Sequence, residues 1–308
     1  MPFEIEKKLV IAVSSSSLFD LSESHKIYED KGLEEYKKHQ EKNIDIILEK
    51  GVAFPFIRRF LNINKLYPEQ SPVEVVLLSK NSPETGLRVF RSIKHYELDI
   101  TRAAFMSGES PYEYIPSFNA SLFLSTNPDD VQSAIDKNYP AGLVLHSSCN
   151  DENDTELRIA FDFDGVIADD ESESVYKNSG LEAFYAHELA NNLIPHQPGL
   201  LADLCKKLSK MQRLESIQEK SKPSYEKILK ISIVTARNAP AHERVITTLK
   251  KLGISPDHIF FLGGMDKNRI LDVLKPHIFF DDQLSHLQPS DKNIPMVHIP
   301  FGIANKKI

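Results

Sequence analysis

The sequence predicts an α/β fold made of two tandem units, each a Rossmann-like parallel sheet with helices on both faces. Short apolar segments alternate with longer segments of helical periodicity, which is typical of such sheets. The two halves of the chain also resemble each other, which indicates an internal duplication. Finally, 308 residues with 41% hydrophobic content are enough for about two domains.

The duplication shows as a long shared register. Residues 11–24 align without a gap with residues 159–172, at a separation of 148 positions. The same separation pairs the Gly-Leu-Glu segments at 32–34 and 180–182. Beyond Gly199 the second half carries a few extra residues, and the separation grows to about 156 positions. The later matches pair Arg88 with Arg244, Gly108 with Gly264, and residues 122–126 with 278–282.

We expect a domain boundary near residue 150. Residues 146–155 are polar and rich in turn-forming and N-cap residue types, as linkers often are. The predicted domains are therefore 1–150 and 151–308. In the second domain, residues 169–228 form a longer segment than a crossover helix requires. This length predicts a mainly helical cap that closes over a site.

The secondary structure follows from apolar runs, periodicity and capping residues. The predicted strands are 8–13, 73–79, 102–106, 121–125, 142–146, 157–162, 230–235, 258–262, 277–281 and 295–299. The predicted helices are 22–39, 41–50, 53–62, 83–96, 129–137, 171–192, 198–212, 239–252 and 267–274.

Two carboxylates follow an apolar strand of the second half. In residues 158–168, Asp162 and Asp164 are one residue apart and precede a glycine. Ligands of parallel sheets bind at the carboxyl ends of strands. Side chains at i and i+2 project to the same side of an extended chain, so this pair concentrates negative charge where a hard cation or a proton can relieve it. The alternative is an ordinary surface turn, since Asp and Gly are turn formers.

Three later stretches favour a site over a turn. Residues 230–237 form a second apolar strand that ends at Thr235, and residues 263–267 open a helix with Lys267. A third strand, within residues 277–282, ends at the adjacent pair Asp281 and Asp282. Because the carboxyl ends of parallel strands meet at one edge of a sheet, we expect these side chains to lie together.

The order Asp-x-Asp, Thr, Lys, Asp-Asp resembles the four motifs of the haloacid dehalogenase-like phosphohydrolases, over roughly residues 155 to 300. The resemblance implies that Asp162 attacks phosphorus and forms an aspartyl-phosphate, while Asp164 serves as general acid and base. It also implies that Asp162, the backbone carbonyl of Asp164 and one of the two later aspartates bind Mg²⁺. We favour Asp282 as the direct ligand and Asp281 as its support.

The phosphate is expected to lie against the second and third motifs. The Thr235 hydroxyl, the backbone N–H at Ala236 and the Lys267 ammonium would offset charge on its nonbridging oxygens. For Arg237 two roles stay open: it reaches the same phosphate, or it pairs with an acid. The first helix of the expected cap offers candidate substrate contacts at Glu171, Ser172, Tyr176, Phe184 and His187.

A narrower resemblance covers nearly the whole chain. The stretches that carry it are residues 12–15, 18–21, 82–90, 99–105, 108–112 and 235–245. Together they resemble the cytosolic 5′-nucleotidase type I family. That family implies Mg²⁺-dependent hydrolysis of nucleoside 5′-monophosphates, often with AMP favoured. One alternative substrate is another small phosphate ester, such as a sugar phosphate. A second alternative is a non-enzymatic phosphoacceptor or nucleotide-binding protein.

The first half lacks the catalytic charges. Ser14 and Ser16 align with the first carboxylate pair, Pro111 aligns with Lys267, and a Ser-Thr pair at 125–126 replaces the second carboxylate pair. We therefore expect this half to build the fold or to complete the substrate pocket. The alternative is a regulatory nucleotide site held by hydroxyls near Ser14, Ser79 and Ser125.

Composition excludes several other classes. The net charge is −7 and no long basic run is present, so a nucleic-acid polymer is a poor partner. The chain shows neither a signal peptide nor an 18-residue apolar span, which predicts a cytoplasmic protein that does not enter membranes. Cys149 and Cys205 lack metal or disulfide spacing and are interpreted as bystander thiols. The oligomeric state is left open, with a homo-oligomer as one alternative.

Overall fold

The first unit is built on a parallel sheet whose central strand, β1 (Leu9–Val13), is a run of five buried apolar residues. Its strands lie in the order β3-β2-β1-β4-β5 and all pair in parallel. The other strands are β2 (Val73–Ser79), β3 (Arg102–Phe105), β4 (Ala120–Ser125) and β5 (Ala141–Val144). Unbroken apolar runs of this kind form strands that are buried on both faces.

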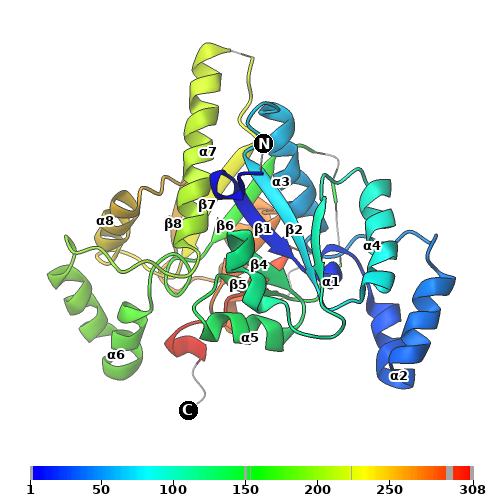
Figure 1. Cartoon of the computed structure of the whole chain (residues 1–308). Helices are drawn as coiled ribbons and strands as arrows, with labels where there is room; N and C mark the ends of the chain where they lie inside the picture. Colours follow the sequence, from blue (N-terminus) through cyan, green and yellow to red (C-terminus); the bar gives the residue numbers. More distant parts are fainter. Residues whose placement is uncertain (1–2, 149–150, 153, 223, 289–293, 306–308) are drawn as a thin grey trace. The chain divides into compact units, whose positions relative to one another are not determined.

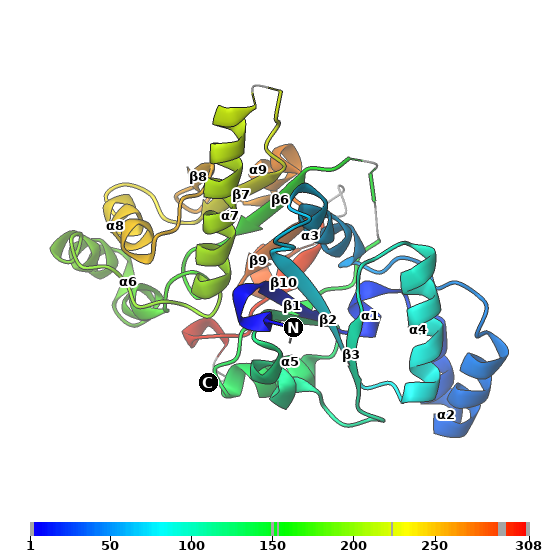
Figure 2. The same cartoon turned by 45° about the horizontal axis from the view of Figure 1, so that its top comes forward.

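The helices of the first unit are α1 (Ser15–Leu18), α2 (Ser22–Lys42), α3 (Phe54–Leu66), α4 (Pro83–His95) and α5 (Pro128–Asp136). Sequence signals set two of the starts. Ser82 caps α4 by accepting from the Thr85 N–H, Asn127 caps α5 in the same way, and a proline follows each cap. In Figures 1 and 2, α2 and α4 lie side by side.

The second unit repeats the same strand order, β8-β7-β6-β9-β10, again all parallel. Its strands are β6 (Leu157–Phe161), β7 (Leu229–Thr235), β8 (His258–Phe261), β9 (Ile278–Asp281) and β10 (Met296–His298). Its helices are α6 (Glu171–Ala190), α7 (Ala202–Ser221), α8 (His242–Leu252) and α9 (Asn268–Leu274). In both views α6 and α8 lie beside each other.

The structure, a computed structural model, describes residues 3–148, 151–152, 154–222, 224–288 and 294–305. The chain divides into two compact units, Met1–Asn153 and Asp154–Ile308. Short 3-10 helices complete the described elements: η1 (Ile5–Lys7), η2 (Tyr112–Tyr114), η3 (Pro116–Phe118), η4 (Leu284–His286) and η5 (Ile303–Asn305). Within these residues, the structure contains no helix with both the length and the apolar character needed to cross a membrane.

Most predicted elements are present, but the helix predicted at 41–50 is wrong. The helix α2 ends at Lys42, because the Asn43 side chain donates to the His39 carbonyl oxygen at 2.9 Å and occupies the last turn. The chain beyond is irregular, and the Leu48 N–H donates to a serine hydroxyl of α4. These partners are distant in sequence, so helical periodicity does not reveal them.

Two predicted helices are interrupted at glycine. Gly32 in α2 and Gly180 in α6 have φ values of 81°, with ψ of −176° and −178°. That conformation costs glycine little and other residues much. Each predicted continuous helix is therefore a pair of shorter helices that meet at an angle.

The helix predicted at 198–212 begins and ends later than expected. The backbone N–H groups of Gly199 and Leu201 donate to carbonyl oxygens of the loop after β6, so the helix α7 starts only at Ala202. It then continues to Ser221. The helix at the corresponding place in the first unit is α3, which has 13 residues, whereas α7 has 20. The helix α7 therefore contains most of the extra residues of the second half.

Candidate active site

One lysine bridges two carboxylates at the strand ends of the second unit. Asp162 directly follows β6 and Asp281 ends β9, and these two strands are neighbours. The Lys267 Nζ atom, at the start of α9, lies 2.9 Å from Asp162 Oδ2 and 2.6 Å from Asp281 Oδ2. The lysine side chain is only 2% exposed. Three of the residues predicted from separate motifs thus lie in direct contact.

The three charges control one another's protonation. Burial raises the pKa of Asp162 to about 7, and repulsion from Asp281 and Asp164 acts in the same direction. Lys267 opposes this shift, because its positive charge stabilises the ionised carboxylate. Burial lowers the pKa of Lys267, but the two aspartates outweigh it and raise that pKa above its usual range. For Asp281, burial is outweighed by Lys267 and His286, which hold its pKa below the ordinary value. The lysine therefore stays charged and stabilises the carboxylates.

Asp282 is buried beside this cluster without a partner. It is fully inaccessible, and among the described residues neither of its carboxylate oxygens has a hydrogen-bond partner. Burial, together with repulsion from Asp162, Glu173 and Asp281, raises its pKa to about 10. An unpaired buried carboxylate is costly, and a bound cation would remove that cost.

Gly165 gives the chain room to pass Asp282. A Cβ atom at this glycine would lie 2.5 Å from Asp282 Oδ2, and the glycine φ is +69°. Both the contact and the conformation exclude a larger residue. The glycine of the first motif is thus required by the carboxylate of the last.

The acidic cluster fits a divalent metal. Asp162, Asp281 and His286 offer ligand atoms within 4.8 Å of one another. Asp281 is already engaged, because it accepts from Lys267 and from the Gln283 backbone N–H at 2.9 Å. Asp282 is not engaged, so it is the carboxylate with most to gain from a cation. Oxygen ligands of this kind suit Mg²⁺.

Arg237 pairs with acids. Its Nε and Nη2 atoms donate to the two oxygens of Asp164 at 2.7 and 2.6 Å, a bidentate pair. Its Nη1 atom donates to Glu188, and its Nη2 atom lies 3.1 Å from His196 Nε2. Burial is outweighed by Asp164 and Glu188, which raise the pKa of Arg237 above its usual range. The sequence left two roles open for Arg237, and in this structure the arginine pairs with acids.

The Thr235 and Ala236 turn lies next to the acidic cluster, since β7 pairs with β6. Thr235 is 1% exposed, and its hydroxyl accepts from the Arg237 backbone N–H at 3.2 Å. Ala236 is exposed. A hydroxyl and an accessible backbone turn at a strand end are a suitable arrangement for an anion.

The candidate substrate residues of α6 fall into two groups. Ser172 is buried and donates to Glu188 at 2.5 Å, while Glu171 pairs with His187 at 2.8 Å. These three predicted residues belong to one polar network, which is buried at Ser172 and partly exposed at Glu171 and His187. Tyr176 and Phe184 form an edge-to-face pair at 6.3 Å, and Tyr176 is half exposed, so only this pair offers an apolar surface.

Four residues were not predicted as site residues. Glu188, His196 and Arg244 belong to this network, and His286 contacts Asp281 in the acidic cluster. Arg244 donates to Glu188 and Glu171, both at 2.9 Å. A signal for Glu188 does exist, because the repeat aligns it with Gln40, so a charge appears in the second half where the first has an amide.

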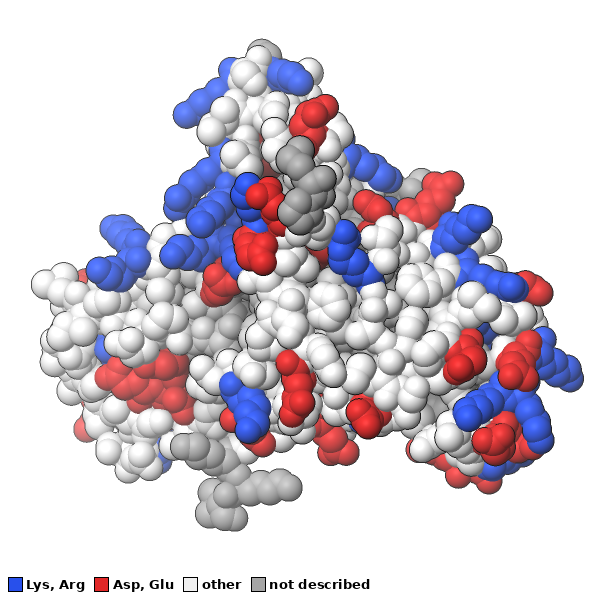
Figure 3. Space-filling model, in the orientation of Figure 1, with Lys and Arg blue, Asp and Glu red and all other residues white. Residues whose placement is uncertain are grey.

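Charged side chains are unevenly spread over the second unit. Figure 3 shows Asp and Glu gathered over the region of α6, whose first turn carries Glu171 and Glu173, and Lys and Arg along α7. Cys205 is a buried free thiol on α7, and burial raises its pKa above the usual range. Cys149 lies outside the described residues.

Fold and site together define an α/β protein with a lysine-bridged acidic cluster at the ends of parallel strands. A family model described as 5′-nucleotidase matches residues 1–306. The human protein named cytosolic 5′-nucleotidase 1B is 33% identical over 302 residues, which are 94% of this chain and 48% of that protein. The chain therefore belongs to the 5′-nucleotidase family and spans about half the length of this curated relative. No solved structure gives a significant match.

Proposed function

We propose that the chain hydrolyses nucleoside 5′-monophosphates such as AMP to a nucleoside and inorganic phosphate, with Mg²⁺ as cofactor. One observation carries the proposal. The buried carboxylate of Asp282 has no partner among the described residues, and it lies against a lysine-bridged pair of aspartates. Family membership supplies the substrate class.

The chemistry follows from the arrangement of the carboxylates. A carboxylate oxygen of Asp162 attacks phosphorus, and the bond from phosphorus to the leaving oxygen breaks as Asp164 donates a proton to that oxygen. Water then attacks the phosphorus of the resulting aspartyl-phosphate and gives a proton to Asp164, while the bond from phosphorus to the Asp162 oxygen breaks. Free phosphate leaves and both carboxyl groups return to their starting state.

The backbone helps to orient the nucleophile. The Phe163 N–H donates to Asp162 Oδ1 at 2.7 Å, while Lys267 contacts Oδ2. Both oxygens are therefore fixed before substrate arrives, which favours attack along one line. Thr235 and the backbone at Ala236 would hold the phosphate oxygens from the neighbouring strand.

The expected metal ligands are Asp162, the backbone carbonyl of Asp164, and Asp282, with Asp281 held as support by Lys267. When bound, Mg²⁺ would neutralise negative charge on the phosphate. Asp164 would leave its bidentate pair with Arg237 to reach the leaving oxygen. Arg237 stays held by Glu188 during that exchange.

We also propose that residues 1–150 and 151–308 are duplicated haloacid dehalogenase-like domains. Equivalent hydrogen bonds support this. The Leu48 N–H donates to the Ser92 hydroxyl at 3.0 Å, and the His196 N–H donates to the Thr248 hydroxyl at the same distance. Arg88 Nε and Arg244 Nε donate to the carbonyl oxygens of Ile46 and Ile194. Only the second copy carries the carboxylates.

Residues 169–228 would form the cap of the catalytic domain. Supporting this, α6 contributes Glu188, which contacts Arg237 at the end of β7. The aromatic pair Tyr176 and Phe184 lies on the same helix and offers a surface for a base. A cytoplasmic location is proposed from the name of the human relative.

A substrate panel tests the proposal. Phosphate release is measured from nucleoside monophosphates and from sugar phosphates at equal concentrations. We expect kcat/KM to be highest for a nucleoside monophosphate. Faster turnover of every sugar phosphate would transfer the assignment to another class of ester, and no phosphate release from any substrate would favour a binding protein.

A further inference from the structure

The first unit contains a large cavity where the second has its acidic cluster. Its volume is about 1500 Å³, and its lining runs from Ser14 to Ser148, all within the first unit. Residues at the carboxyl ends of β1, β2, β4 and β5 contribute to it, namely Ser14, Ser79, Ser125 and Val144. That is where parallel α/β sheets bind ligands, and the volume exceeds the range of about 300–1,000 Å³ that is typical of small-molecule sites.

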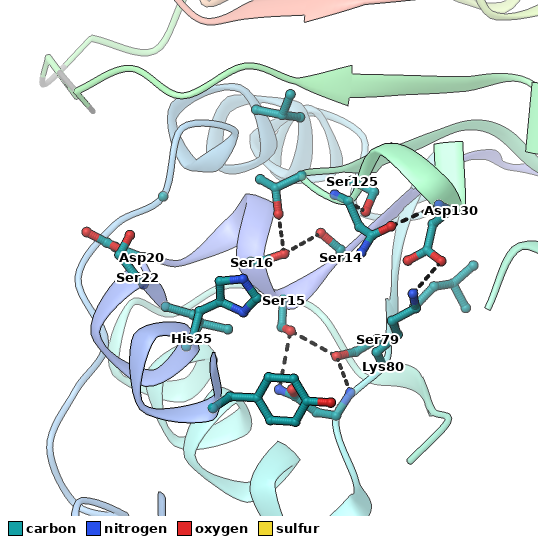
Figure 4. Close-up of a pocket in the computed structure, with 18 of the residues that line it drawn as sticks. Ser14, Ser15, Ser16, Asp20, Ser22, His25, Ser79, Lys80, Ser125 and Asp130 are labelled. Atoms are coloured by element: carbon teal, nitrogen blue, oxygen red, sulfur yellow. Dashed lines mark hydrogen bonds and ion pairs between the residues drawn. The ribbon is translucent and has the colours of Figure 1, made fainter. Parts of the chain in front are cut away.

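The floor of this cavity is made of hydroxyl groups. Ser14 Oγ lies 3.2 Å from Ser16 Oγ, and Ser16 Oγ lies 2.6 Å from Thr126 Oγ1. Ser15 Oγ lies 2.8 Å from Ser79 Oγ. Figure 4 shows Ser14, Ser15, Ser16 and Ser79 meeting at the end of β1, with His25 facing the same space. Each hydroxyl both donates and accepts, so the cluster can reorganise around an anion.

The phosphate-binding turns of the second unit keep their geometry here. Ser79 Oγ accepts from the Asn81 N–H at 3.1 Å, as Thr235 Oγ1 accepts from the Arg237 N–H at 3.2 Å. Ser125 Oγ accepts from the Asn127 N–H at 3.1 Å. The equivalent bond in the second unit is the one that Asp281 Oδ1 accepts from the Gln283 N–H. The turns are thus preserved while the carboxylates are replaced.

The charges that line the cavity also allow an anion to bind without a metal ion. Where the second unit has Asp162 and Asp164, this unit has neutral serines, so no carboxylate repels a phosphate at the end of β1. Lys80 follows Ser79 directly and lies 2.9 Å from Asp130. Three lysines and three acids line the cavity: Lys37, Lys50, Lys80, Asp20, Glu84 and Asp130. The serine floor is therefore uncharged, and the three lysines and three acids of the lining balance one another.

An aromatic pair closes one side. Tyr28 and Tyr36 both line the cavity, with ring centres 6.0 Å apart at 83°. They correspond in the repeat to Tyr176 and Phe184, at 6.3 Å and 79°. Tyr28 is about half exposed, so its ring is available to a planar ligand. Stacking of a base on an aromatic side chain is worth about 1–3 kcal/mol.

We propose that this cavity is a second, non-hydrolytic site for a nucleoside monophosphate. The phosphate binds the hydroxyls of Ser14, Ser16 and Ser79, and the base lies against Tyr28. No phosphoryl transfer occurs, because a serine hydroxyl replaces the carboxylate nucleophile, and binding requires no metal. The choice of a nucleotide rests on the proposed function, whereas the binding of a phosphate rests on the hydroxyl floor.

The test counts nucleotide sites on the full chain. Asp162→Asn is used to prevent hydrolysis, and AMP binding is measured by calorimetry with Mg²⁺ present. We expect two sites per chain. Adding Ser16→Asp, which installs the residue that the second unit has at the aligned position, should weaken one site at least about tenfold. Lys65→Gln, which makes the same change of −1 in charge on the exposed end of α3, should leave both sites unchanged.

Three further results decide the details. In chelator the Ser16-sensitive site should persist, since it needs no metal. Tyr28→Ala, an exposed change that folding tolerates, should weaken AMP at that site and leave inorganic phosphate unaffected. One AMP site that ignores both substitutions overturns the proposal, and equal affinity for AMP and inorganic phosphate overturns the nucleotide assignment. Phosphate release by the unaltered chain tests the proposed function separately.

Discussion

Replacing Glu188 by glutamine should separate the charge of the buried network from its shape. Glu188 is inaccessible to solvent and accepts from Arg237, from Arg244 at 2.9 Å and from Ser172 at 2.5 Å. Burial alone would raise its pKa, but His196, Arg237 and the other partners hold that pKa well below the ordinary value. It is therefore an ionised carboxylate between two buried guanidinium groups.

The size of the effect follows from what remains after the change. Glutamine fits this position sterically, because the first unit has Gln40 there, with its Oε1 accepting from Arg88 at 3.2 Å. Glu188→Gln thus keeps the shape and leaves two buried arginines short of one negative charge. Breaking a buried ion pair in this way costs about 3–5 kcal/mol. Glu182→Gln, on the exposed side of α6, is the matched control and should cost less than about 0.5 kcal/mol.

A second substitution tests the cause. The hydrogen bonds after β2 and β7 make Asn81 the counterpart of Arg237, so Arg237→Asn combined with Glu188→Gln gives the second unit the two residues that the first unit has at these positions. The double variant should recover at least about 1 kcal/mol relative to the sum of the single effects. Activity should not recover, because Asp164 has lost its bidentate partner, and a small displacement of a catalytic group can cost about 100-fold in rate.

The assay is denaturant unfolding of the four proteins of this cycle, with phosphate release measured in parallel. Additive single effects would show that the two side chains do not interact. A Glu188→Gln protein as stable as the Glu182→Gln control would refute the buried ion-pair reasoning. In either case the network could not be assigned the role of holding Arg237.

Two further predictions concern the metal and the first unit. Removing Mg²⁺ with a chelator should abolish phosphate release and adding it back should restore it, whereas full activity in chelator would exclude the metal from the reaction. Burial raises the pKa of Asp151, but Arg58, Lys50 and Arg59 outweigh it and lower that pKa to about 2, below the ordinary 3.8. Its contribution to stability is therefore present above pH 3.8 and lost as the pH falls through about 2. In unfolding experiments Asp151→Asn should lower stability at pH 7 and flatten the acid end of the stability curve, and an unchanged curve would show that the ion pairs contribute nothing.

Local signals predicted most of the fold. The short helix α1 and the 3-10 helices were not predicted. Apart from these and the elements corrected above, the described strands and helices begin and end within four residues of their predicted limits. The errors have two causes. The segment after Asn43 is not helical because α4 binds its backbone, and α2 and α6 are interrupted because Gly32 and Gly180 adopt a non-helical conformation.

The candidate site was predictable as far as it depends on strand ends. Asp162, Lys267 and Asp281 were expected to meet because parallel strands bring their carboxyl ends to one edge, and the structure places them in contact. The network around Glu188 was not predicted, because its members come from helices whose polar faces look like ordinary surface. Only the comparison with Gln40 marks that position as different.

Direct detection of phosphate on Asp162 tests the central claim. The unaltered chain is mixed with a nucleoside monophosphate and Mg²⁺, quenched in acid during turnover, digested and analysed by mass spectrometry. We predict one phosphate on the peptide that contains Asp162, and none when Asp162 is changed to asparagine. Phosphate release at the normal rate without a labelled Asp162 peptide would contradict the mechanism.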